Sequence, residues 1–103
     1  MNNVVKNNLP QIIDVCKKYQ VKSLYLFGSA ATDNFKKNSD VDFLIEYSRD
    51  AEGLPLQPFD YFDVLFELEN ITRTKVDLLV KEAMRNAYFI QSVEKQKILI
   101  YES

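Results

Sequence analysis

The sequence predicts an α/β (α+β) domain, with helices packed on one small mixed sheet of about four strands. Short apolar runs rich in aromatic and β-branched residues alternate along the chain with segments in which apolar residues recur at helical spacing. Hydrophobic residues make up 47% of the chain and charged residues 27%, which is typical of a globular protein and not of a disordered one. The length of 103 residues favours a single domain, residues 1–103.

The first element is a helix expected over residues 9 to about 20. Pro10 suits the first turn of a helix, where a backbone N–H has no partner within the helix. Ile12, Cys16 and Tyr19 then recur at helical spacing, so we expect these three side chains to face the core. Cys16 is expected to be a buried, unreactive thiol.

Two strands and a short helix follow. The first strand is expected over residues 23–27, an apolar run that ends at Gly28. Residues 30–35 are expected to form the short helix and residues 36–39 a polar loop. A second apolar run predicts a strand over residues 41–47.

The second half of the chain repeats this alternation. Glycine and proline residues predict one long loop over 48–58. A helix is expected over 59–71 and a strand over 75–80. A helix from residue 82 to about 94 and an edge strand over 98–101 complete the chain.

Aromatic residues are numerous for so small a core, with six tyrosines and seven phenylalanines. Phe59, Phe62, Leu65 and Phe66 recur near helical spacing, and we expect them to face the core. Because a small core does not easily absorb every ring, an exposed surface that binds a partner is the alternative.

The composition excludes several kinds of site. The chain has no histidine, which excludes His-based acid–base catalysis and the usual His-containing zinc sites. Cys16 is the only cysteine, so neither an intrachain disulfide nor a Cys-rich metal site can form. The net charge of −2 argues against a broad basic face that binds nucleic acid. No signal peptide or membrane-spanning run is evident, so we expect a cytoplasmic protein that does not bind membranes.

Two carboxylates, Asp40 and Asp42, lie at the start of the second expected strand. Because side chains alternate along a strand, both project from the same face. Like charges repel, and their joint desolvation is costly unless a divalent cation lies between them. Hard oxygen ligands suit Mg²⁺, which takes further ligands from water and phosphates. The pair therefore predicts a Mg²⁺ site.

Ten residues separate Gly28 and Ser29 from Asp40. Gly28 has no side chain, so phosphate oxygens can approach the backbone closely. Ser29 can add a hydroxyl, and free N–H groups of the short helix would face the anion. We expect Gly28 and Ser29 to bind phosphate.

Asp77 is the third carboxylate and lies inside the apolar strand over 75–80. A charge there is costly unless it is paired or bound to a metal. If its strand neighbours that of Asp42, Asp77 either binds a second Mg²⁺ ion or accepts the proton of an attacking hydroxyl. Together these residues outline a site for phosphoryl or nucleotidyl transfer.

These motifs resemble those of the minimal nucleotidyltransferases in the DNA polymerase beta-like superfamily. The matching pieces, within residues 22–101, are LYLFGSA, the ten-residue gap, SDVDFLIEY and KVDLLV. The resemblance implies the polymerase beta-like nucleotidyltransferase fold and a phosphate-binding role for Gly28 and Ser29. It also implies that the metal-binding and catalytic carboxylates are Asp40, Asp42 and Asp77.

Many members of this size are similar to antitoxins encoded beside HEPN-domain ribonucleases. For such pairs the resemblance implies transfer of AMP from ATP to a tyrosine of the HEPN toxin. Family members often follow the Gly-Ser pair with basic residues and a further glycine, whereas residues 30–33 here read Ala-Ala-Thr-Asp. This departure keeps a second hypothesis open, an antitoxin that neutralises a toxin by forming a complex without turnover.

A metal-dependent nuclease fits less well, because such sites often place a lysine after the second carboxylate, and here FLIEY follows Asp42. A domain this small can bind ATP and metal but offers little area for a long polymer. We therefore expect an acceptor partly supplied by another chain, while the oligomeric state, homo- or hetero-oligomer, stays open.

Overall fold

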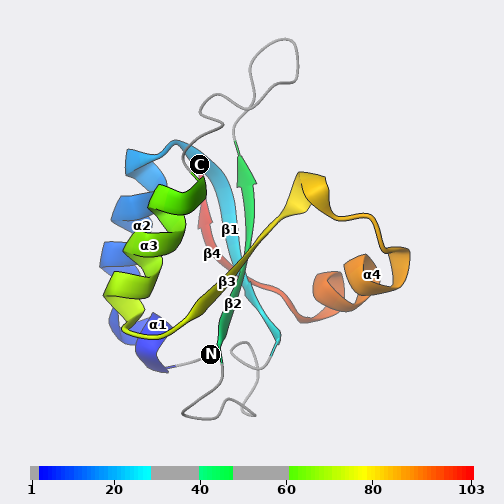
Figure 1. Cartoon of the computed structure of the whole chain (residues 1–103), viewed down its shortest axis with the longest axis horizontal. Helices are drawn as coiled ribbons and strands as arrows, with labels where there is room; N and C mark the ends of the chain where they lie inside the picture. Colours follow the sequence, from blue (N-terminus) through cyan, green and yellow to red (C-terminus); the bar gives the residue numbers. More distant parts are fainter. Residues whose placement is uncertain (1–2, 29–39, 48–60) are drawn as a thin grey trace.

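The computed structural model describes residues 3–28, 40–47 and 61–103 (Figure 1). Its elements, in chain order, are α1 (Asn3–Asn7), α2 (Leu9–Lys18), β1 (Val21–Phe27), β2 (Val41–Tyr47), α3 (Tyr61–Thr72), β3 (Val76–Val80), the 3₁₀ helix η2 (Lys81–Ala83), α4 (Ala87–Gln96) and β4 (Ile98–Glu102). The short helix expected over 30–35 and the loops expected over 36–39 and 48–58 lie outside the described residues.

The strands of the described residues form one mixed sheet in the order β3-β2-β1-β4. β1 runs antiparallel to both of its neighbours, whereas β2 and β3 are parallel. The α/β (α+β) fold class is confirmed, and so is the edge position of the last strand.

One face of the sheet packs against α1, α2 and α3, which lie together on one side in Figure 1. Alternate residues of the central strands point to this side and are fully buried, including Leu24, Leu26, Phe43 and Ile45. This is the larger of the two hydrophobic clusters among the described residues, and it packs the sheet against the helices.

Helix α2 confirms the inward side chains that its spacing predicts. Ile12 and Cys16 are buried, and Tyr19 is partly buried against the same cluster. Burial raises the pKa of the Cys16 thiol to about 12, which keeps it protonated and unreactive at neutral pH. None of the helices in the described ranges is both long and apolar enough to span a membrane.

The opposite face of the sheet packs against α4, on the other side of the molecule in Figure 1. Phe27, Leu44 and Val93 form a smaller buried cluster there. Residues of β1 and β2 that alternate with the larger core therefore point to this second face.

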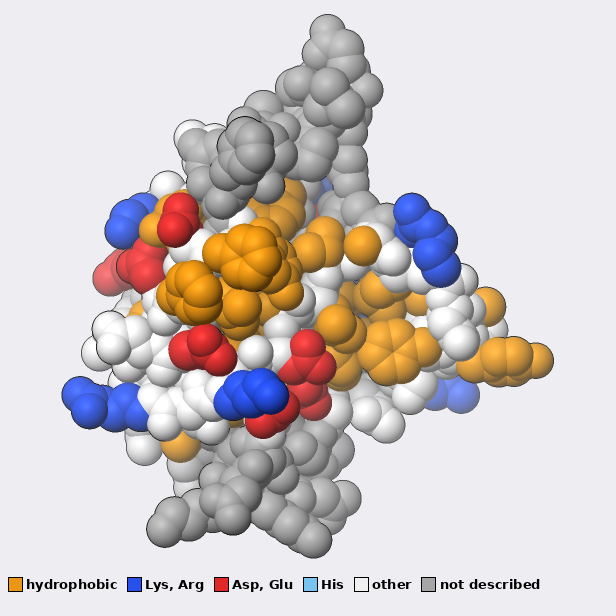
Figure 2. Space-filling view, viewed as in Figure 1, with side chains coloured by type: hydrophobic (Ala, Val, Ile, Leu, Met, Phe, Trp, Pro, Cys, Tyr) orange, Lys and Arg blue, Asp and Glu red, His pale blue; other side chains and the backbone are white. Residues whose placement is uncertain are grey.

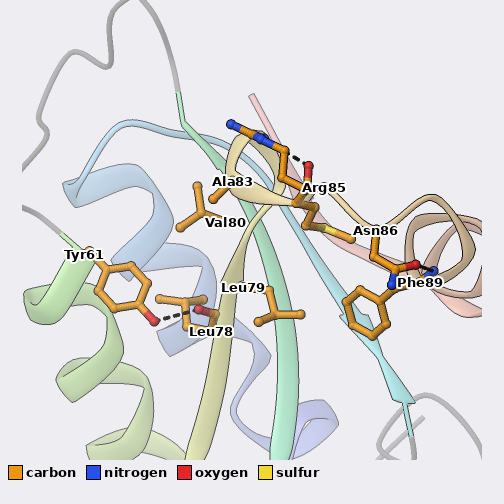
Figure 3. Close-up of a pocket in the computed structure, with 9 residues that line it drawn as sticks. Tyr61, Leu78, Leu79, Val80, Ala83, Arg85, Asn86 and Phe89 are labelled. Atoms are coloured by element: carbon orange, nitrogen blue, oxygen red, sulfur yellow. Dashed lines mark hydrogen bonds between the residues drawn. The ribbon is translucent and has the colours of Figure 1, made fainter.

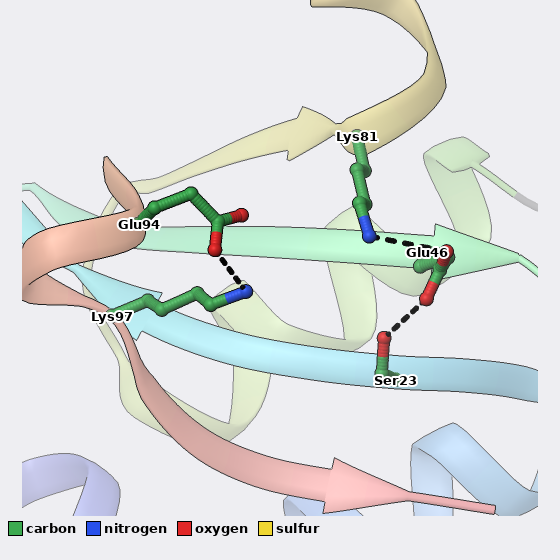
Figure 4. A network of polar contacts seen from close by, with 5 residues as sticks. All are labelled: Ser23, Glu46, Lys81, Glu94 and Lys97. Carbon is green, nitrogen blue, oxygen red and sulfur yellow. Dashed lines mark hydrogen bonds and ion pairs between the residues drawn. The ribbon is translucent and has the colours of Figure 1, made fainter. Parts of the chain in front are cut away.

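Polar contacts extend the second face beyond this cluster (Figure 4). Glu46 of β2 accepts a hydrogen bond from Ser23 Oγ (3.0 Å) and pairs with Lys81 Nζ (3.4 Å). At the end of α4, Lys97 Nζ pairs with Glu94 Oε2 (2.9 Å) and lies 4.2 Å from the centre of the Tyr25 ring.

The helix predicted from residue 82 to about 94 is wrong at its start. Residues 81–83 form η2, and α4 begins only at Ala87. Asn86 Oδ1 accepts a hydrogen bond from the Phe89 N–H (3.0 Å) and so caps α4. Asparagine is favoured at this capping position and disfavoured inside a helix, because its side chain competes for backbone groups.

The prediction that Phe62 and Phe66 of α3 face the core is also wrong. Their side chains are 62% and 60% exposed, whereas Val64 and Leu68 of the same helix are buried. The two phenylalanine rings lie 6.1 Å apart between centroids on the outer face of the helix. Phe59, which we also expected in the core, lies outside the described residues.

Candidate functional site

Three adjacent strands bring together Gly28, Asp42 and Asp77. Phe27, the last residue of β1, pairs with Asp42 of β2, and Gly28 follows it directly. Asp42 in turn pairs with Asp77 across the parallel β2–β3 ladder. The two strands are neighbours, which is the condition under which the sequence predicts a joint role for their carboxylates.

Gly28 lies directly against the carboxylate of Asp42. Its φ of +66° is in the left-handed region that side-chain-bearing residues rarely adopt. A Cβ atom built on Gly28 would collide with Oδ2 of Asp42. Glycine is therefore required here both by the backbone conformation and by the close approach of the carboxylate.

The Asp42 carboxyl has an unusually high proton affinity. Its pKa is raised from 3.8 to about 6, first by burial and then by the negative charges of Asp77 and Asp40. Asp42 is half-buried, whereas Asp40 and Asp77 are exposed. Asp77 and Asp40 therefore act on Asp42 through space, and we call these three carboxylates, at the end of the sheet where β2 and β3 begin, the acidic cluster.

The acidic cluster offers the oxygen donors that a hard cation such as Mg²⁺ prefers. Within the ranges that the structure describes, no three acidic or cysteine side chains already form a group that could hold a metal ion. Like charges repel, so three carboxylates are expected to close around a cation only together with it. The donor types and the repulsion on Asp42 fit a divalent cation at this position.

Tyr61, the first residue of α3, is a neighbour of the cluster that the sequence analysis missed. Its Oη donates a hydrogen bond to the carbonyl of Leu78 in β3 (2.7 Å). Burial and then the charge of Asp77 raise the pKa of the Tyr61 hydroxyl. No sequence signal identifies this residue, because its position depends on how α3 packs on the edge of the sheet.

A groove of about 440 Å³ lies beside the acidic cluster, between β3, η2 and α4 (Figure 3). We call it the β3–α4 groove and define it by Leu79, Met84 and Phe89, with Tyr61 at its other side. Figure 2 shows hydrophobic side chains over α3 and beside α4, with acidic side chains between the two areas. The sequence analysis did not predict this groove.

Ser29, the second expected phosphate-binding residue, lies outside the described residues. Of the two residues expected to bind phosphate, the structure therefore describes Gly28 alone, directly after the last residue of β1. The three carboxylates expected at the site are all described.

A family model described as "Polymerase beta, Nucleotidyltransferase" matches residues 10–103. The chain belongs to this nucleotidyltransferase family. The match includes all of the elements from β1 to β4 that position Gly28 and the acidic cluster.

Relatives from this nucleotidyltransferase family carry names that specify an activity. MJ1379 of Methanocaldococcus jannaschii, named as a protein adenylyltransferase, is 36% identical over 83 residues, which are 81% of this chain and 80% of that protein. MJ0128 of the same organism, named likewise, is 37% identical over 84 residues. Protein adenylyltransferase MntA of Aphanizomenon flos-aquae is 38% identical over 64 residues, 57% of this chain and 43% of that protein.

Solved structures share the fold. A minimal nucleotidyltransferase superposes with a TM-score of 0.75 at 20% identity and covers 95% of each chain. A chain of a toxin–antitoxin complex with AMP-PNP superposes with a TM-score of 0.69 at 20% identity, covering 93% of this chain and 74% of the other. These similarities establish a common architecture for the strands that carry the acidic cluster.

Proposed function

We propose that this nucleotidyltransferase transfers AMP from ATP, with Mg²⁺, to a hydroxyl group on a partner protein. The observation that carries the proposal is the acidic cluster itself. Asp42 pairs in register with Asp77, lies against Gly28 and has its pKa raised by burial and then by both other carboxylates. Carboxylates so close together repel one another, and a structural role does not account for three of them at the end of one small sheet.

Each residue of the site has a proposed role. Asp40 and Asp42 would hold Mg²⁺ and, through it, the triphosphate, while Gly28 and Ser29 bind the phosphates beyond the reacting one. When bound, Mg²⁺ would neutralise charge that develops on the phosphate oxygens. Asp77, on the neighbouring strand, orients the acceptor hydroxyl and takes its proton. Positioning and charge neutralisation would supply the rate enhancement without a covalent enzyme intermediate.

The partner protein is proposed to be a HEPN-domain toxin. Relatives at 36% and 37% identity are named protein adenylyltransferases. Solved structures with the same fold include a tri-AMPylated HEPN toxin in complex with an MNT antitoxin. The exposed phenylalanines of α3 supply an apolar surface that such a complex could cover. Because the reaction uses ATP, we place it in the cytoplasm.

The test uses ATP labelled at the α-phosphate, Mg²⁺ and the co-purifying partner protein. Asp42→Asn is expected to lower label transfer by roughly a thousandfold, because it removes a charge that acts on the transferring phosphate. Asp14→Asn on α2 is the matched control, since Asp14 is exposed and lies outside the acidic cluster. Full transfer by Asp42→Asn would show that the cluster is not catalytic.

An inactive antitoxin that binds a toxin is the second candidate function. It is favoured by the absence of basic residues over 30–33 and by the exposed Phe62 and Phe66. The double variant Asp40→Asn with Asp42→Asn separates the two. Loss of toxin neutralisation with an intact complex supports the enzyme, whereas retained neutralisation supports the binding module.

A further inference from the structure

In the sheet that the described residues form, the strand that carries Asp77 lies at an edge, next to β2. Backbone groups of successive residues in a strand point alternately to its two sides. The carbonyl of Lys75, directly before β3, accepts a hydrogen bond from the Val41 N–H (3.0 Å) and so faces β2. By this alternation the backbone groups of Asp77 also face β2, whereas those of Val76 and Leu78 face the free edge.

Two side chains of α3 take the place of a neighbouring strand on that edge. Glu69 Oε2 accepts a hydrogen bond from the Val76 N–H (3.1 Å), and the Tyr61 hydroxyl donates one to the Leu78 carbonyl (2.7 Å). Figure 3 shows the Tyr61 hydroxyl directed at this carbonyl. The residues on both sides of Asp77 are therefore bonded to α3.

These two hydrogen bonds differ in kind from the apolar contacts of α3. Val64 and Leu68 are buried in the larger hydrophobic cluster and attach the helix to one face of the sheet. Hydrophobic contacts are non-directional, whereas a hydrogen bond requires a defined distance and angle. The bonds made by Glu69 and Tyr61 therefore fix the position of the β3 backbone more closely than packing alone does.

The charge on Asp77 gives β3 a reason to move. Asp77 lies in register opposite Asp42, and the two carboxylates repel each other. An edge strand of five residues, paired on one side, opens more readily than a central strand. The hydrogen bonds from α3 oppose displacement of β3 away from β2.

We propose that Tyr61 and Glu69 are positioning residues, which hold β3 so that the Asp77 carboxylate stays beside Asp42 for nucleotidyl transfer. The proposal rests on the function proposed above. Both side chains act through the backbone on either side of Asp77. ATP binding is then largely independent of them, because the residues proposed to hold the triphosphate lie on or beside β1 and β2.

Amide hydrogen exchange of the full, metal-free chain tests the hold on β3 without turnover. Loss of one hydrogen bond makes opening of the strand easier, so the Asp77 N–H is expected to exchange about fivefold faster in Tyr61→Phe and in Glu69→Ala. The Leu26 N–H, in the central strand β1, reports on global stability and should keep its rate. Unchanged exchange of Asp77, or equal acceleration of Leu26, would overturn the proposal.

Transfer kinetics with labelled ATP and the co-purifying partner protein test the catalytic consequence. Tyr61→Phe and Glu69→Ala are expected to lower kcat roughly tenfold and to change the KM for ATP by less than about twofold, because only the position of Asp77 is affected. Glu69→Gln keeps an oxygen acceptor for the Val76 N–H and is expected to retain most of the wild-type kcat. A wild-type kcat in both Tyr61→Phe and Glu69→Ala would overturn the proposal.

Two matched controls separate loss of the β3 contact from the change of residue type. Glu67→Ala removes a glutamate of the same helix that pairs with Lys18 of α2 (3.3 Å). Tyr88→Phe removes a hydroxyl from a residue of α4 that is 85% exposed. Both variants are expected to keep the wild-type kcat and Asp77 exchange rate. Losses as large as in Tyr61→Phe would overturn the proposal, because the effect would not depend on contacts to β3.

Failure of this proposal is distinguishable from failure of the proposed function. If the wild-type chain transfers no AMP, the function is wrong, and the exchange rates still decide whether α3 holds β3 in place. If transfer depends on Asp42 but Tyr61→Phe and Glu69→Ala keep the wild-type kcat, the function stands and the positioning role is wrong. Tyr61→Phe keeps the packed ring, so this variant decides the outcome even if Glu69→Ala does not fold.

Discussion

Asp42 and Glu46 lie on the same face of the same strand, yet their surroundings are opposite. Glu46 accepts a hydrogen bond from Ser23 and pairs with Lys81. Although burial would raise the pKa of Glu46, these contacts and the charge of Lys22 hold it below the usual value. Asp42 is half-buried against Gly28 and repelled by two further carboxylates, so its pKa is raised.

The comparison separates a carboxylate that stabilises the fold from one that costs stability. Glu46 is charged because its neighbours favour the charge, so it links β1, β2 and η2. Asp42 is charged at neutral pH in spite of its neighbours, so it keeps a strong attraction for a cation. A small domain tolerates this cost because its larger core lies on the other face of the sheet.

Among substitutions at the two carboxylates and their surroundings, the largest loss of stability is expected from Gly28→Ala, which disturbs the wall of the acidic cluster. A left-handed backbone costs an L-residue about 1–2 kcal/mol, and the new methyl group would displace the Asp42 carboxylate. Urea unfolding should show that Gly28→Ala lowers the free energy of unfolding. Gly28→Asn is the control, because asparagine tolerates positive φ but still carries a Cβ. If Gly28→Asn binds Mg²⁺ and ATP as the wild type does, the close contact with Asp42 is unimportant.

The second prediction is a gain in stability instead of a loss. Asp42→Asn is expected to raise the free energy of unfolding of the metal-free protein at pH 7 by about 1 kcal/mol, after allowance for solvent screening of a half-exposed group. The folded-state pKa lies above the unfolded value, so the folded state binds the proton more tightly. Wild-type stability therefore falls as the pH rises from about 4 through 6, and Asp42→Asn removes this fall.

Urea unfolding at pH 4 and pH 7, with EDTA or with Mg²⁺, measures this effect. Mg²⁺ is expected to restore stability at pH 7 in the wild type and not in Asp42→Asn, because the metal neutralises the repelled charge. An Asp42→Asn variant that is less stable than the wild type at pH 7 would show that Asp42 is a structural residue like Glu46.

A smaller loss of stability is expected from Glu46→Gln, which weakens the contacts to Ser23 and Lys81. A partly exposed ion pair and one hydrogen bond together contribute about 0.5–1 kcal/mol. The comparison is sharpest when Glu46→Gln and Asp42→Asn are both measured at pH 7. The first should lower the free energy of unfolding and the second should raise it. Unchanged AMP transfer by Glu46→Gln would confirm that Glu46 takes no part in the reaction.

The smallest effect on stability is expected on α3. Phe62→Ser and Phe66→Ser should change the free energy of unfolding by less than about 0.5 kcal/mol, because both rings are largely exposed. Their effect should appear instead as weaker binding of the partner protein, measured by calorimetry. Phe43→Ala, in the buried core, is the contrasting variant and should cost about 3–5 kcal/mol.

The sequence by itself determined the order of the four strands and of helices α2, α3 and α4, and it identified the candidate carboxylates, but it did not predict α1. Alternating apolar residues fix which face of a strand is buried, and an aspartate in such a run, as at residues 42 and 77, is conspicuous because its burial is costly. Helical spacing failed for Phe62 and Phe66, because a stripe of apolar residues does not say which of its members the sheet covers. The start of α4 after Asn86 does have a sequence signal, since asparagine is favoured at the capping position, but the spacing of apolar residues alone does not mark it.

Only the tertiary structure decided that β2 and β3 are neighbours in parallel register, which brings Asp42 opposite Asp77. It also decided that Gly28 touches the Asp42 carboxylate and that Tyr61, Leu79, Met84 and Phe89 enclose a groove. Strand pairing and groove formation depend on contacts between segments far apart in the chain. Local spacing carries no information about such contacts, because packing of the whole domain selects them.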